Sequence, residues 1–73
     1  MTLANRIRMI RISKGLSQEY VAEKLNISQP AYSKIERRAE CCSFYTLQKI
    51  AVALEVSTPF LIDIECIAYL QKE

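Results

Sequence analysis

Four helix-capping positions divide this chain into short segments in which apolar residues recur every three or four places. Ser17, Ser28 and Ser43 each stand directly before such a segment, and Ser57 or Thr58 stands before another. Serine is a strong helix N-cap, because its hydroxyl accepts a hydrogen bond from a first-turn N–H that has no helical partner. The chain also has only one Gly and two Pro, so few positions favour hairpins or long loops. The spacing therefore predicts a series of short helices.

Five helices are expected. The first begins at Leu3 and ends at Gly15. The second ends at Asn26, because Asn, like Gly, readily takes the left-handed conformation that stops a helix. The third begins at Gln29 and has Pro30 in its first turn, where the missing N–H is not needed. The residues expected to face the core in the fourth helix (44–54) and the fifth (58–72) are Phe44, Leu47, Ile50, Ala51, Leu54, Phe60, Leu61, Ile64 and Ile67.

The length of 73 residues fits one all-α domain over residues 1–73. No run of about 18 apolar residues is present, so we expect a soluble, cytoplasmic protein without a membrane span. The cysteine count of three is odd and histidine is absent, which argues against a disulfide framework, a zinc site and a His-activated nucleophile. We therefore expect a protein that is not an enzyme and has no metal, no cofactor and no catalytic residue.

The charge is unevenly distributed along the chain. Residues 1–38 hold eight Lys and Arg against three Glu, a net charge of +5, whereas residues 39–73 hold two against five acidic residues, a net charge of −3. Clustered cations gain affinity for phosphates by releasing condensed counterions. The asymmetry suggests an anionic partner for one face, although charge alone favours an ordinary solvated surface.

Residues 18–37, "QEYVAEKLNISQPAYSKIER", resemble the helix-turn-helix of the phage repressor and Cro family, also called the xenobiotic-response-element family. Ala22 stands where that motif has a small residue, and hydrophobic residues stand where it requires them, at Val21, Leu25, Ile27, Tyr32 and Ile35. The stretches "LANRIRMIRISKGLSQ" and "SFYTLQKIAVALEVSTPFLI" are similar to the family's first helix and to its fourth and fifth. The resemblance implies a five-helix, lambda-repressor-like, all-α fold and binding to double-stranded DNA.

The resemblance also implies roles for individual residues. Gln18 is expected to contact a phosphate, and Gln29 to contact a base edge in the major groove. Ser28, Ser33 and Lys34 align with further groove-facing positions, Arg37 and Arg38 with phosphate contacts, and Arg11 with Glu36 as an ion pair between the first and third helices. The plain alternative for each is a solvated polar or charged side chain. Pro30 departs from the family's usual polar reader and offers only an apolar surface.

Several positions depart from the family's usual glycines. Asn26 and Glu55 replace two of them, and Arg38 and Ala39 occupy a region where a glycine commonly closes the third helix. Because the loop "RRAECC" also lacks Gly and Pro, the third helix is expected to run about a turn longer. The thiols of Cys41 and Cys42 are expected to be inert, with a redox-responsive role as the alternative.

The carboxyl-terminal segment has more apolar residues than one helix face needs. Those left over after the core is covered are Ile62, Cys66, Tyr69 and Leu70. A helix that is apolar nearly all round is buried on more than one side, so these residues predict a homodimer interface, with contact to the first helix as the alternative.

The sequence thus favours a dimeric, sequence-specific transcriptional regulator that reads a palindromic operator. Repressor, autoregulator and restriction–modification controller are all compatible with it, in a bacterium or a phage and in association with the nucleoid. The alternative is a helical protein-interaction module, such as an antitoxin-type domain, in which the outer face of the third helix meets an acidic protein partner.

Overall fold

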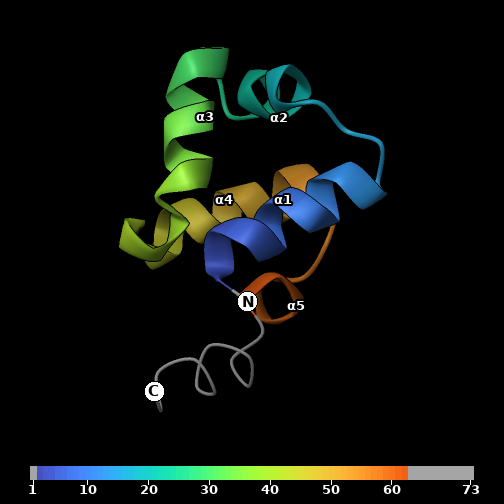
Figure 1. The fold of residues 1–73 in the computed structure, drawn as a ribbon, viewed down its shortest axis with the longest axis vertical. Helices are drawn as coiled ribbons and strands as arrows, with labels where there is room; N and C mark the ends of the chain where they lie inside the picture. Colours follow the sequence, from blue (N-terminus) through green and yellow to red (C-terminus); the bar gives the residue numbers. More distant parts are fainter. Residues whose placement is uncertain (1, 63–73) are drawn as a thin grey trace.

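The computed structural model describes residues 2–62 and is all-helical over that range (Figure 1). It contains the helices α1 (Leu3–Ser13), α2 (Gln18–Lys24), α3 (Gln29–Arg37), α4 (Phe44–Leu54) and α5 (Thr58–Ile62), and a 3₁₀ turn η1 (Ala39–Cys41). The expected five-helix, all-α fold is confirmed. The predicted dimer residues Cys66, Tyr69 and Leu70, and the remainder of the expected fifth helix over 58–72, lie outside the described residues.

Each expected serine cap forms its hydrogen bond. Ser17, Ser28 and Ser43 accept from backbone N–H groups three residues later at 3.0, 3.2 and 3.2 Å. Ser57, rather than Thr58, caps α5, because its Oγ accepts a hydrogen bond from the Phe60 backbone N–H at 3.2 Å. Removing such a cap costs a helix about 1 kcal/mol, so the four serines fix where these short helices begin.

Three residues in the left-handed region end helices or turn the chain. Gly15 has φ of 71°, and Asn26 and Glu55 have φ of 59° and 60°. Asn26 therefore makes the turn between α2 and α3 as predicted. Glu55 does not favour this conformation by itself; the Val56 N–H donates to the Ala51 carbonyl at 3.0 Å and closes the end of α4 around it.

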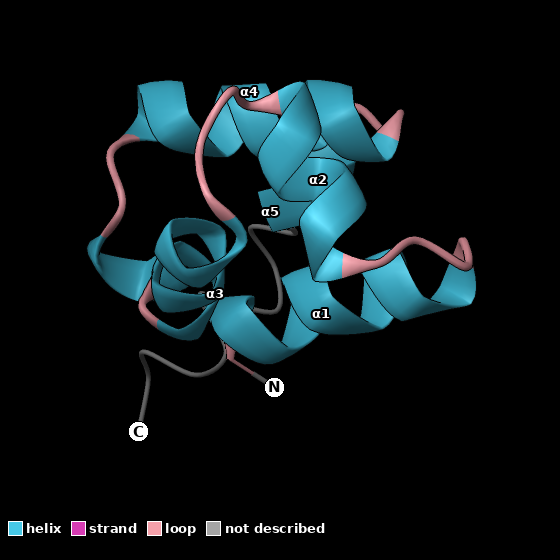
Figure 2. Cartoon of the chain, turned by 90° about the horizontal axis from the view of Figure 1, so that it is seen from above, coloured by secondary structure: helices cyan, strands magenta, loops and turns pink. Residues whose placement is uncertain are grey.

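The core lies between α1 and α4, which overlap in Figure 1 but lie apart in Figure 2, and α2, α3 and α5 pack against these two helices and close it. Its largest fully buried side chains are Tyr32, Ile7, Ile50, Leu54, Leu61 and Val21. Ala22 of α2 is also fully buried, and α2 packs closely against α3. A larger side chain at that position would push the two helices apart, because packed interiors have almost no free volume.

Three sequence-based expectations about local structure are wrong. Phe44 and Phe60 do not cover the core; their side chains are 59% and 54% exposed. The third helix does not run longer either, because it ends at Arg37 and the chain continues as the separate 3₁₀ turn. Ala39 in that turn is fully buried, so tertiary burial ends α3 where the sequence offers no Gly or Pro.

Two sets of hydrogen bonds join α1 to other parts of the chain, one to α5 and one to η1. Arg6 donates hydrogen bonds to the backbone carbonyls of Phe60 and Leu61, and its guanidinium lies 4.9 Å from the centre of the Phe60 ring. Glu40 of η1 accepts a hydrogen bond from the backbone N–H of Ala4 at 3.2 Å. A carboxylate is favourable at a helix N-terminus, so Glu40 links η1, which follows α3, to the start of α1.

Candidate nucleic-acid interface

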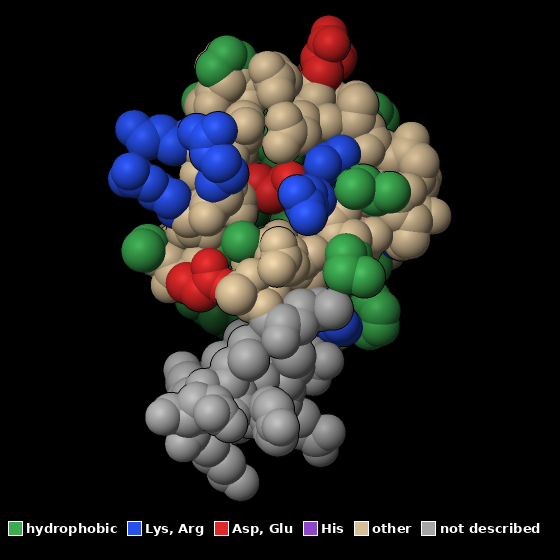
Figure 3. Space-filling model, viewed as in Figure 1, with side chains coloured by type: hydrophobic (Ala, Val, Ile, Leu, Met, Phe, Trp, Pro, Cys, Tyr) green, Lys and Arg blue, Asp and Glu red, His purple; other side chains and the backbone are tan. Residues whose placement is uncertain are grey.

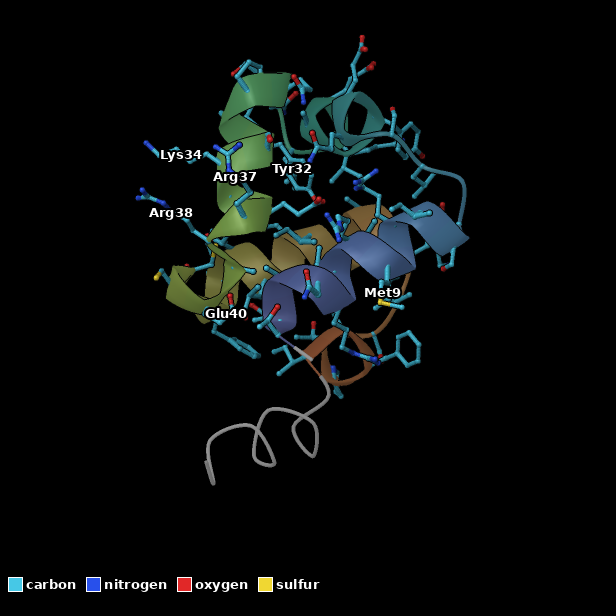
Figure 4. All side chains as sticks on the ribbon, viewed as in Figure 1. Met9, Tyr32, Lys34, Arg37, Arg38 and Glu40 are labelled. Carbon is cyan, nitrogen blue, oxygen red and sulfur yellow. The ribbon has the colours of Figure 1, made fainter. Side chains whose placement is uncertain are left out.

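The outer face of α3 presents polar and cationic side chains. Gln29, Ser33 and Arg37 are spaced four residues apart, which places them along one side of the helix. Gln29 and Arg37 are exposed and Ser33 is half-buried. Lys34 and Arg38 are also exposed, and both point away from the body of the molecule (Figure 4). Lys and Arg side chains accordingly gather at the side of the molecule formed by α3 (Figure 3).

A buried ion pair fixes α3 against α1. Arg11 Nε and Nη2 donate to the two carboxylate oxygens of Glu36 at 2.9 and 3.2 Å, and Arg11 Nη1 donates to the Leu16 carbonyl at 2.9 Å. Arg11 is 8% and Glu36 3% exposed. The structure therefore contains the ion pair that the sequence implied. Desolvation offsets much of the attraction in such a pair, so its main effect is to set the orientation of the helices.

Tyr32 completes the environment of this carboxylate from the inner face of α3. Its hydroxyl donates to Glu36 Oε2 at 2.7 Å, and its ring is fully buried. Burial and the hydrogen bond to Glu36 raise the pKa of Tyr32. Burial alone would raise the pKa of Glu36, but the hydrogen bonds from Arg11, Tyr32 and Gln18 outweigh it and lower that pKa below its usual value. Glu36 is therefore ionised and Tyr32 is a neutral donor.

The network extends from the core to the outer face of α3. Gln18, at the start of α2, donates from Nε2 to Glu36 Oε1 at 3.2 Å. Its Oε1 accepts from Gln29 Nε2 at 2.7 Å. The nitrogen and the oxygen of the Gln18 amide thus both form intramolecular hydrogen bonds. The amide of Gln29 is held in place by a chain of hydrogen bonds that begins at Arg11. The phosphate contact of Gln18 stays a prediction, and its side chain here is placed to position Gln29.

Ser28 differs from the remaining outer residues because it is also the N-cap of α3. Its Oγ accepts the α3 capping hydrogen bond from Ala31 at 3.2 Å, which leaves its hydroxyl proton available for a further acceptor. Pro30 follows in the first turn of α3 and is exposed, as expected. The structure thus places Ser28, Gln29, Ser33, Lys34, Arg37 and Arg38 on or at the ends of one helix, with Gln18 beside its first turn.

Sequence reasoning missed Arg8. This exposed arginine of α1 lines a hollow of about 300 Å³ together with Asn5 and Arg37, and with Glu36 at its inner side. The charge of Glu36 is already balanced by Arg11, so the hollow carries two further cations. The spacing of apolar residues placed Arg8 on the polar face of its helix, but only the packing of α1 on α3 brings it next to Arg37.

The two described cysteines lie outside this surface and are free thiols. Cys42 is partly buried, with Sγ 3.7 Å from the Arg38 carbonyl oxygen and 3.8 Å from that of Ile35. Burial raises the pKa of the Cys42 thiol, with smaller contributions from Cys41 and Glu40. Because the thiolate is the reactive form, this environment supports the interpretation of Cys42 as inert.

Two helices joined by a tight turn, the second with a cationic outer face, define a helix-turn-helix DNA-binding protein. The family model described as helix-turn-helix matches residues 7–61, and the chain belongs to that family. It is a DNA-binding transcription regulator of the phage repressor and Cro-like type. No curated protein and no solved structure gives a significant match. None of the helices within residues 2–62 is long and apolar enough to cross a membrane.

Proposed function

We propose that this protein is a dimeric repressor or autoregulator that reads a palindromic operator through the outer face of α3. The observation that supports the proposal is the position of Gln29, an exposed side chain held by Gln18 at the start of a helix with a cationic outer side. A glutamine amide can bond adenine N6 and N7 bidentately in the major groove. A side chain that is already oriented loses less conformational entropy on binding.

The remaining polar side chains divide into two groups by chemistry. Ser33 and Lys34, in the middle of α3, carry groups that can bond base edges or the adjacent DNA backbone. Arg37, Arg38 and Arg8 have charges suited to phosphates, which fix the pose on the duplex without reading its sequence. Regulation in this proposal needs only occupancy of the operator, so no catalytic residue, metal or cofactor takes part. The site of action would be the nucleoid, in the cytoplasm of a bacterium.

Dimerisation is proposed through the carboxyl-terminal segment. Ile62, at the end of the described chain, is half-buried against the core, and Cys66, Tyr69 and Leu70 follow it in sequence. α1 and α5 also carry exposed apolar side chains: Met9, Ile12 and Phe60 are 54%, 60% and 54% exposed. A twofold dimer places two reading helices about 34 Å apart, one turn of DNA, and thereby matches a palindrome.

Gln29→Ala should relax recognition of the cognate operator. Removal of a bidentate base contact lowers discrimination by about 1–3 kcal/mol per contact, while binding to unrelated DNA should stay nearly unchanged. The measurement is a competition titration with an operator selected from a random pool of duplexes. Gln48→Ala, the same change at an exposed position on α4, is the control. An equal loss of affinity for operator and random DNA would exclude base readout by Gln29.

Leu70→Glu should convert the dimer to monomers, because a carboxylate cannot be buried unpaired in an apolar interface. Sedimentation equilibrium measures the change, and operator affinity should fall with it. Phe44→Glu places the same charge on an exposed apolar residue of α4 and should leave the dimer intact. A Leu70→Glu protein that remains dimeric would rule out this segment as the interface.

A titration of duplex DNA at two salt concentrations separates the regulator from the alternative interaction module. Steep salt dependence with a preference for one palindrome supports the regulator. If the protein does not bind any duplex at low salt, its α3 face serves a protein partner instead.

A further inference from the structure

A second surface feature lies between α2 and α4. The carboxyl-terminal end of α2 and the second half of α4 enclose a groove of about 400 Å³, and α2 lies across α4 in Figure 2. The residues that line it are Lys24, Leu25, Asn26, Gln48, Lys49, Val52 and Ala53. None of them belongs to the candidate nucleic-acid interface, so DNA binding leaves this groove unexplained.

The floor of the groove is apolar. Leu25 is half-buried against the core and Ala53 is buried, whereas Val52, on the α4 side of the groove, is 77% exposed. A single exposed valine is ordinary in a folded protein. Here, however, it borders a hollow whose base is also apolar, so a side chain seated between α2 and α4 would bury Val52 and Leu25 together. Burial of apolar surface is favourable by about 25 cal/mol per Å².

Each rim of the groove carries a lysine that lies beside an aromatic ring of its own helix. Lys24 Nζ lies 5.3 Å from the ring centre of Tyr20, one turn earlier on α2. Lys49 Nζ lies 5.0 Å from the ring centre of Tyr45, one turn earlier on α4. A cation over an aromatic face is held by the ring quadrupole, so each ammonium is kept beside its own helix. No acidic side chain is among the residues that line the groove.

We propose that this groove binds an acidic amphipathic helix of a partner protein. An apolar side chain of that helix sits between Leu25 and Val52, and carboxylates on either side of it meet Lys24 and Lys49. An amphipathic helix laid in an apolar groove is a common mode of peptide recognition, and complementary charge at the rim sets its specificity and orientation. Nucleic acid does not fit this site, because phosphates would satisfy the rim but leave the apolar floor unused.

The test uses the full chain, labelled with ¹⁵N, and a designed helical probe of about 15 residues, long enough to retain some helicity alone. The probe carries leucines on one face and glutamates on the flanking positions. Addition of the probe should shift the amide signals of Leu25, Val52 and Ala53, and saturate. In the Lys24→Glu, Lys49→Glu double variant the dissociation constant should rise about tenfold or more, because like charges then face each other.

Charge exchange supplies the controls. A probe with lysine in place of each glutamate should bind the double variant and not the original protein, and this recovery also shows that the variant is folded. Lys14→Glu changes an exposed lysine outside the groove and should alter binding of the acidic probe by less than about twofold. Lys49→Glu alone, which makes the same change in net charge, should weaken binding measurably.

Three outcomes would overturn the proposal. The first is the absence of shifts at the groove with about 1 mM probe, and the second is a set of shifts confined to the outer face of α3. The third concerns this chain's own residues 63–73, which also combine apolar and acidic residues. If a peptide of that sequence fills the groove more tightly than the designed probe, the occupant is another part of this protein rather than a partner.

Discussion

Arg11→Ala should lower the free energy of unfolding by about 3–5 kcal/mol, the cost of leaving one member of a buried ion pair unpaired. The variant lacks three hydrogen bonds of the original protein, two to Glu36 and one to the Leu16 carbonyl. Glu36, 3% exposed, then retains only Tyr32 and Gln18 as donors. Urea denaturation of the purified protein measures the change. For a domain of this size it is a large share of the total stability.

The matched control is Arg8→Ala, which removes an exposed arginine from the same helix and should change stability by no more than about 0.5 kcal/mol. The pH dependence supplies an independent readout. Since folding lowers the pKa of Glu36, its contribution is fully present above the unfolded-state pKa and is lost as the pH falls through the folded-state value. This acid-side loss should shrink in Arg11→Ala. If the free energy of unfolding of Arg11→Ala is less than about 1 kcal/mol below that of the original protein, the pair contributes orientation alone.

Simultaneous replacement of Lys34, Arg37 and Arg38 by Ala should weaken binding to all duplex DNA by about two to three orders of magnitude near 0.1 M salt. Each neutralised phosphate releases condensed counterions, which is worth about tenfold in affinity at that concentration. The slope of log affinity against log salt should become shallower by about 0.9 for each phosphate that is no longer neutralised, or about 2.7 for all three. Fluorescence anisotropy across a range of salt concentrations gives both quantities. The preference for the operator over random DNA should fall by no more than the share that Lys34 contributes at a base edge.

A triple change of equal charge separates local binding by α3 from the effect of net charge. Lys14, Lys24 and Lys49 are exposed and lie off α3, so their replacement by Ala should leave most of the salt slope in place. Equal effects from the two triple variants would mean that the protein binds DNA through its overall charge and that α3 holds no special position.

The sequence predicted the helices well because their boundaries depend on local chemistry. The serine caps act on backbone N–H groups within three residues, and Asn26 can turn the chain by its own conformational preference. The errors occur where distant residues decide. α3 ends where Ala39 is buried in the following 3₁₀ turn, and Phe44 and Phe60 stay exposed although their spacing placed them toward the core.

The candidate site follows the same division. The residue types on α3 and their spacing along it were readable in the sequence, as was the pairing of Arg11 with Glu36 through the family resemblance. The link from Gln18 to Gln29 was not, because it joins side chains of two helices whose relative placement depends on the core. Arg8 was missed for the same reason.

The sequence by itself therefore determined the helical segments, their caps and the polar strip along α3, since each depends on residues within a turn or two of one another. Tertiary structure alone decided which side chains meet: Gln18 with Gln29, Arg8 with Arg37, and α2 with α4 around an apolar groove. The physical reason is that burial is a property of the packed core as a whole, and no short stretch of sequence specifies what lies across it.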